Sequence, residues 1–107
     1  MDPLPMFTTD WSQVAPVEHP GITGFALWRT QNVGDIRVRM VEYSPGYQAD
    51  HWCAKGHVIL CLEGELDVHT ADGQSFYLSP GVSYQVGDGD PAHRSETRTG
   101  AKLFIVD

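Results

Sequence analysis

The stretch that decides the fold is residues 46–64, GYQADHWCAKGHVILCLEG. Three side chains that commonly bind metals, His51, Cys53 and His57, lie close together in it. Residues two apart in a strand point the same way, so His51 and Cys53 can face one interior. His57 joins them if residues 54–56 keep that alternation or turn the chain. The pattern indicates a cluster of ligands on one face of an extended segment.

The second half of this stretch is the apolar run 58–62, bounded by Gly56 and Gly64. It is too short for a typical helix and suits a strand covered on both sides. In the phase of the ligands, Ile59 and Cys61 point inward and make the interior largely apolar. The remaining residues of the run form an outward apolar face, which needs cover from the N-terminal residues or from a second subunit. This predicts a homodimer.

The rest of the chain is predicted to be short strands and turns. Residues 36–41 alternate with the period of a half-buried strand. Turn sequences rich in Gly, Pro, Asn and Asp recur at 32–35, 44–46, 71–73 and 79–81. We expect about eight or nine strands in an all-β domain, either a sandwich or a closed barrel, including the double-sheet jelly roll.

The N-terminal residues differ from the remainder in their proline content. Four prolines within residues 1–20 disfavour helix. Apolar side chains are interleaved with them, so we interpret residues 1–21 as an irregular arm that packs on the domain or on a neighbour. A frayed tail is the alternative. The β-domain is expected to span residues 22–107.

His93 is the candidate fourth ligand, because it lies on a distant predicted strand and could close the site from across the domain. Imidazole and thiolate together suit zinc, iron, nickel or copper, and do not suit magnesium or calcium. The alternative for Cys53 is a small buried apolar residue, and for His57 a hydrogen bond within the core. From the residues alone, both interpretations stay open.

Residues 46–64 resemble the first motif of the cupin superfamily, which reads Gly, His-x-His, Glu three or four residues on, then Gly after six more. His51 and Cys53 take the two His positions, His57 takes the Glu position, and Gly64 ends the motif. The run Asp-His-Trp-Cys also resembles small bacterial cupins with a DHCW-type motif. The resemblance covers residues 22–107 and implies a jelly-roll barrel with a metal inside, and a homodimer.

The second cupin motif is matched less fully, with His93 in its His position after one extra residue. Gly87 stands where Pro is usual and Thr97 where Asn is usual. An alternative alignment puts Tyr84 in the His position and leaves His93 on the rim.

Cupins typically use three His and one Glu, whereas the set implied here is His51, Cys53, His57 and His93. A thiolate is softer than a carboxylate and disfavours manganese. We therefore expect one divalent transition metal ion per chain, with zinc, iron or nickel as candidates.

Several other residues are candidates for a pocket beside the metal. Arg37 and Arg39 share a strand face with Tyr43. If that face is interior, the two arginines could hold a carboxylate-bearing ligand by bidentate hydrogen bonds. If it is exterior, they are solvated and paired with surface acids. Tyr84 is a further candidate.

Charge and composition exclude some partners. Seven Lys and Arg face fourteen Asp and Glu, for a net charge of −7. Without a basic cluster, binding to nucleic acid or to an anionic membrane surface is not expected. No apolar run is long enough for a membrane span, no signal peptide is recognised, and two cysteines do not indicate a disulfide framework. A cytoplasmic protein is expected.

The expected function is that of a small metal-binding cupin acting on a small molecule. The resemblance implies a dioxygenase-like or isomerase-like enzyme with a mononuclear metal. Two alternatives remain, namely a ligand-binding or sensing module without catalysis, and a barrel whose metal is purely structural.

Overall fold

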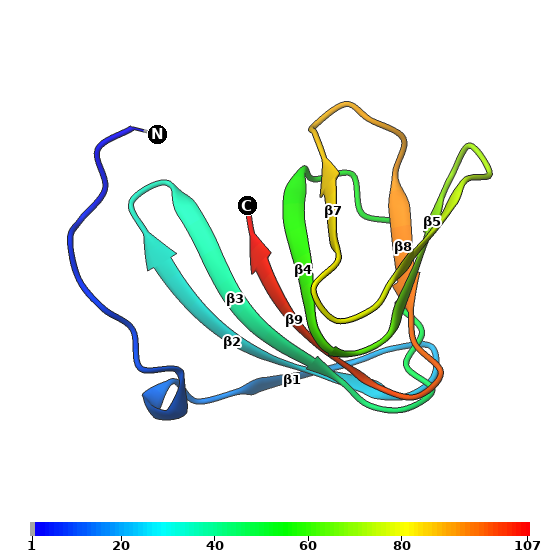
Figure 1. The fold of residues 1–107 in the computed structure, drawn as a ribbon, viewed down its shortest axis with the longest axis horizontal. Helices are drawn as coiled ribbons and strands as arrows, with labels where there is room; N and C mark the ends of the chain where they lie inside the picture. Colours follow the sequence, from blue (N-terminus) through cyan, green and yellow to red (C-terminus); the bar gives the residue numbers. More distant parts are fainter. Residues whose placement is uncertain (1) are drawn as a thin grey trace.

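Residues 2–107 are described by the structure, a computed structural model, and form two antiparallel β-sheets that pack on each other (Figure 1). The only helix among them is the 3₁₀ turn η1 (Trp11–Gln13). The larger sheet has the order β1 (Val17–Pro20), β2 (Phe25–Val33), β3 (Ile36–Tyr43), β9 (Ala101–Val106), β4 (His57–Gly64), β7 (Ser83–Val86). The smaller sheet has the order β6 (Ser75–Leu78), β5 (Leu66–Thr70), β8 (His93–Glu96).

The chain passes repeatedly between the two sheets. β4 belongs to the larger sheet, β5 and β6 to the smaller, β7 to the larger, β8 to the smaller and β9 to the larger again. From β4 onward, consecutive strands other than the paired β5 and β6 therefore lie in opposite sheets, which is the arrangement of a double-sheet jelly roll. The all-β class predicted from the turn spacing is confirmed.

The core lies between the sheets and follows the strand alternation. Ile59 and Cys61 of β4 are buried with Leu103 and Ile105 of β9, as the ligand phase predicts. The outward residues of β4 behave differently: Val58 is 44% and Leu62 is 38% exposed. The expectation that this run is covered on both sides is wrong for the single chain, because only its inner face packs against the second sheet.

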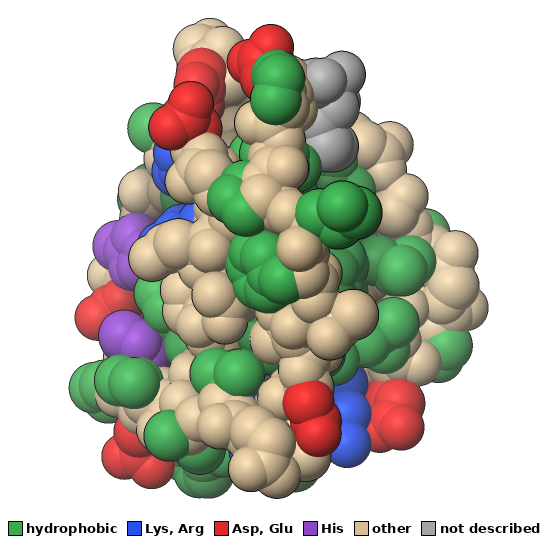
Figure 2. All heavy atoms as spheres, turned by 90° about the vertical axis from the view of Figure 1, so that its left-hand side faces the viewer, with side chains coloured by type: hydrophobic (Ala, Val, Ile, Leu, Met, Phe, Trp, Pro, Cys, Tyr) green, Lys and Arg blue, Asp and Glu red, His purple; other side chains and the backbone are tan. Residues whose placement is uncertain are grey.

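The N-terminal segment is partly strand. Residues 17–20, which the sequence assigns to the arm, form β1 and pair with Phe25–Trp28 at the edge of the larger sheet. Pro20 is tolerated there because an edge strand has backbone groups without a partner. Met6 and Phe7, before β1, are exposed. Figure 2, which looks at this side of the molecule, shows hydrophobic side chains gathered near the middle of the face.

Gly64 is required by the turn between β4 and β5. Its φ of 77° lies in the left-handed region, and a Cβ there would meet the backbone oxygen of Gly100 at 2.0 Å. Only glycine allows this close approach. The turn sends the chain into the second sheet, so this glycine has a structural role at the end of the sequence motif.

Among the described residues, no helix has the length and apolar character needed to cross a membrane.

Candidate metal centre

The backbone fixes Cys53 opposite His93. The Cys53 N–H donates to the His93 carbonyl at 2.7 Å, and the His93 N–H donates to the Cys53 carbonyl at 2.9 Å. Directly opposed residues of an antiparallel pair place their side chains on the same face. This bridge joins the loop before β4 to the start of β8, and it explains how residues forty positions apart in the sequence come together.

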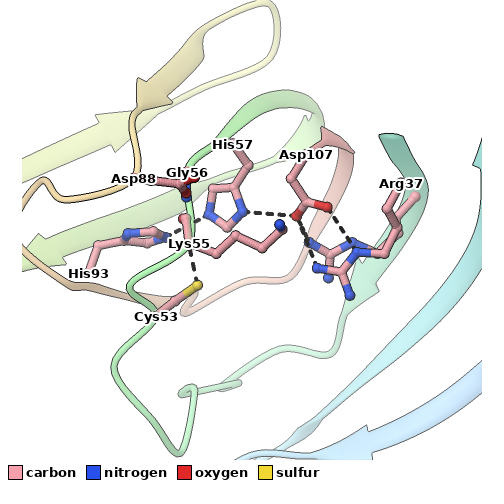
Figure 3. A network of polar contacts seen from close by, with 9 residues as sticks. Arg37, Cys53, Lys55, Gly56, His57, Asp88, His93 and Asp107 are labelled. Carbon is pink, nitrogen blue, oxygen red and sulfur yellow. Dashed lines mark hydrogen bonds and ion pairs between the residues drawn. The ribbon is translucent and has the colours of Figure 1, made fainter. Parts of the chain in front are cut away.

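His57, the first residue of β4, completes the group. Its side chain is in the same phase as the buried Ile59 and so points inward. One ligand atom each from Cys53, His57 and His93 lies within 4.8 Å of the other two. The Nε2 atoms of His57 and His93 are 2.7 Å apart and face each other across a hydrogen bond (Figure 3).

Asp107 supports His57 from behind. Its Oδ2 lies 3.2 Å from Nδ1 of His57, in line with the two rings in Figure 3. The carboxylate accepts, so Nδ1 carries the proton and the lone pair of Nε2 faces the centre. A carboxylate that fixes the tautomer in this way is a regular partner of metal-binding histidines.

The carboxylate of Asp107 is itself held by two arginines and is fully buried. Arg37 donates from Nε and from a terminal nitrogen at 2.9 and 3.0 Å, a bidentate fork. Arg39 donates once, at 2.9 Å. Arg39 is therefore interior and Arg37 partly exposed, and the fork of Arg37 holds a carboxylate of the protein itself.

The protonation states suit metal binding. Burial raises the pKa of Asp107, but the hydrogen bonds from Arg37 and His57 and the charge of Arg39 outweigh it and bring it to about 2. Burial lowers the pKa of His93 to about 4, helped by the neighbouring His57. Burial also lowers the pKa of His57. Both imidazoles are therefore neutral at neutral pH, as metal ligands must be.

His51 is not brought into this group. Its side chain is 66% exposed and its Nδ1 lies 2.7 Å from the carboxylate of Asp50. Residues 50–52 are outside any strand, so no ladder holds the alternation that the sequence pattern assumes. His51 instead borders the cavity beside the centre.

That cavity has a volume of about 280 Å³. Of the sequence-predicted pocket residues, Arg37, Arg39, Tyr43 and Ile59 line it. Cys61 and Tyr84 do not: Cys61 is buried in the core, and the Tyr84 ring packs 5.7 Å from the ring of His93. Other lining residues are Trp28, Tyr47, Ala49, His51, Cys53, His57, His93, Arg94, Ser95 and Ile105.

Asp107 was not predicted from the sequence, although a signal exists. Leu103 and Ile105 alternate along β9 as buried residues, and Asp107 continues their phase into the interior. Two arginines on an interior face also require a carboxylate, because buried charges need partners. Combining the two patterns would have identified Asp107.

The donor set fits a transition metal. One thiol and two imidazoles suit zinc, iron, nickel or copper, as the sequence predicts. Without a metal, the short distance between the two rings requires Nε2 of His93 to donate its proton to Nε2 of His57. A cation bound by both Nε2 atoms would replace that proton. Cys53, His57 and His93 therefore form a candidate metal site.

The sequence matches no family model and no curated protein. Solved structures share the fold. A predicted oxalate decarboxylase from Thermotoga maritima is 15% identical, with 94% of this chain and 96% of that chain covered and a TM-score of 0.79. A sugar phosphate isomerase from a cupin superfamily, from Silicibacter pomeroyi, is 19% identical, with 92% and 73% covered and a TM-score of 0.71. A cupin-2 domain containing protein from Shewanella frigidimarina is 20% identical, with 75% and 78% covered and a TM-score of 0.62.

At these identities the likeness establishes the fold. The chain has the cupin fold, which the motif at residues 46–64 predicts.

Proposed function

We propose that this protein, whose fold is that of the cupins, holds one divalent transition metal ion with Cys53, His57 and His93 and uses it to act on a small molecule in the adjoining cavity. The observation that carries the proposal is the convergence of three ligand atoms within 4.8 Å, from separate segments of the chain, beside a cavity of about 280 Å³.

An open ligand position favours catalysis over a structural role. Structural zinc sites are closed by four protein ligands, whereas catalytic sites keep three and leave one position open. Here three donors converge while His51 turns to Asp50. His51 also borders the cavity, so it is proposed as the fourth ligand only in a state with its ring rotated inward.

When bound, such a metal supplies Lewis-acid or oxygen-binding chemistry to a ligand in its open position. The chain's own residues have simpler tasks. Asp107 holds His57 in one tautomer and orientation. Ile59 and Ile105 form an apolar wall that keeps water from that side of the cavity.

We place the activity among dioxygenase-like or isomerase-like reactions of small molecules. Two of the solved structures with this fold are described as an isomerase and a predicted decarboxylase, and these descriptions agree with small-molecule chemistry. A reducing cytoplasm, in which Cys53 stays a thiol, and a homodimer built on the outer face of β4 are parts of the same proposal.

The test is the metal content of purified protein expressed with iron, zinc and nickel available. We expect about one ion per chain, and its loss in Cys53→Ser. The matched control is Cys61→Ser, which changes the other thiol but leaves the three ligands in place. Equal metal content in Cys53→Ser and the unaltered protein would remove Cys53 from the site and contradict the proposal.

The second candidate is a module that binds a small molecule without turning it over. The observation that favours it is the cavity lining, which among residues 2–107 contains no Asp or Glu, while burial raises the pKa of Tyr43. Apart from its histidines, the lining therefore supplies no general base at neutral pH. Oxygen uptake by the ferrous protein with a panel of thiols, diketones and phenols separates the two: turnover supports the enzyme, and saturable binding without turnover supports the module.

A further inference from the structure

Arginine side chains gather at the cavity beside the metal centre, in a protein whose net charge is negative. The chain carries a net charge of −7, with only seven Lys and Arg. Three of these seven, Arg37, Arg39 and Arg94, line this one cavity, and no Asp or Glu among the described residues lines it. A low-dielectric pocket lined by one sign of charge concentrates ligands of the other sign.

The two inner arginines are not equally occupied. Arg37 donates two hydrogen bonds to Asp107, from Nε and from one terminal nitrogen. Arg39, which is only 5% exposed, gives Asp107 one hydrogen bond, and its Nε has no partner. Two guanidinium groups against one carboxylate leave one positive charge in excess. A buried cation in this state is stabilised by a further anion.

The residues around Arg39 limit the size and chemistry of a ligand that could supply this anion. The guanidinium lies 4.5 Å from the centroid of the Trp28 ring, so its plane is held against an aromatic face. Tyr43, Ile59 and Ile105 complete an apolar wall around the same cavity. A volume of about 280 Å³ is at the lower end for small-molecule sites. The cavity thus combines a buried guanidinium that has an unpartnered Nε, an apolar wall and little space.

We propose that Arg39 binds the carboxylate of a small ligand whose apolar body packs on the wall formed by Tyr43, Ile59 and Ile105. This rests on the proposed function in one respect only: the rest of the ligand then lies against the metal held by Cys53, His57 and His93. The ligand class is a small monocarboxylate with an apolar or aromatic body. A free phosphate shares the charge but gains nothing from the apolar wall.

The test compares benzoate with benzamide, which have nearly the same shape and differ in charge. Titration calorimetry is performed on the purified full chain, as isolated and after chelation. We expect benzoate to bind at least tenfold more tightly than benzamide in both samples, as a charge-assisted hydrogen bond provides. Equal affinities, or tighter binding of inorganic phosphate than of benzoate, would overturn the proposal. This comparison needs no variant.

A variant then assigns the cation. Arg39→Lys keeps the charge but removes the planar group, and we expect it to weaken benzoate binding about tenfold or more. The control is Arg29→Lys, because Arg29 is paired with Glu42 away from the cavity. Unchanged benzoate affinity in a folded Arg39→Lys protein would refute the role of Arg39.

The same samples separate the two proposals. Elemental analysis reports the metal, and calorimetry reports the anion. Selective benzoate binding by protein that takes up no metal supports the inference and contradicts the metal-dependent function. Metal uptake with no preference for benzoate over benzamide supports the metal-dependent function and contradicts the inference about Arg39.

Discussion

Replacing Asp107 with asparagine removes a charge at the point where the metal centre and the arginine pair meet. The carboxylate is fully buried and accepts from His57 and from both arginines. Asparagine has nearly the same shape but no charge, so the buried Arg39 and the partly exposed Arg37 would be left without a counter-charge. We expect a lower free energy of unfolding and weaker metal binding.

The magnitude follows from the pKa and from the burial. A pKa of about 2, against an ordinary 3.8, corresponds to about 2 kcal/mol of stabilisation of the ionised form. Removing one partner of a buried ion pair costs about 3–5 kcal/mol when no hydrogen bond replaces it. Because the amide keeps part of the hydrogen bonding, we expect a loss of about 2–4 kcal/mol, or ~10–20 °C in Tm. Loss of the histidine's carboxylate partner weakens metal binding by about 10–100-fold.

The assay is urea unfolding of metal-free protein, followed by a competition titration with zinc and a chromophoric chelator. The control is Asp35→Asn, which makes the same change in the exposed turn between β2 and β3. If Asp107→Asn unfolds within about 1 kcal/mol of that control and binds zinc equally well, the assigned role of Asp107 is refuted.

Three further predictions concern other parts of the molecule. Because the pKa of His93 is lowered in the folded protein, the unfolded chain takes up a proton at higher pH than the folded one. The free energy of unfolding of the metal-free protein should therefore fall by up to about 3 kcal/mol as the pH falls from 6.5 to about 4. Urea unfolding across this range checks the prediction, and a free energy that does not change with pH contradicts it. Gly56→Ala places a Cβ 2.7 Å from the backbone nitrogen of Asp88, so the segment between two ligands must move, and zinc affinity should fall at least tenfold. The control is Gly87→Ala, whose Cβ would lie 3.4 Å from a carboxylate oxygen of Asp90, an ordinary contact distance. Equal zinc affinities of the two variants would contradict the claim that close packing at Gly56 positions the ligands. Val58→Glu, on the exposed face of β4, should turn a dimer into a folded monomer in sedimentation, and a monomeric unaltered protein would remove the predicted dimer.

The sequence predicts the fold well because strand alternation and turn residues are local signals. The two-residue period of a strand is enough to predict that Ile59 and Cys61 point inward. The turns expected at Gly and Pro are enough to predict the all-β class. The phase also places His57 on the inner face. The pairing of Cys53 with His93 cannot be derived in this way, because it depends on a bridge between distant segments.

The differences arise where the chain leaves a regular ladder or where charges compensate each other. His51 precedes β4 in an irregular loop, and there a local hydrogen bond to Asp50 decides where the ring points. The arginine face is ambiguous from the sequence, since Arg37 and Arg39 suit solvent as well as the interior. Only the register of β3 with β9 brings them to Asp107.

The measurement that tests the central claim most directly is X-ray absorption at the zinc edge of the zinc-loaded protein. Ligation by Cys53, His57 and His93 predicts one sulfur at about 2.3 Å and two nitrogens at about 2.0–2.1 Å, with a lighter atom in the remaining position. A spectrum without a sulfur ligand in the loaded protein would contradict the claim that these three side chains hold the ion.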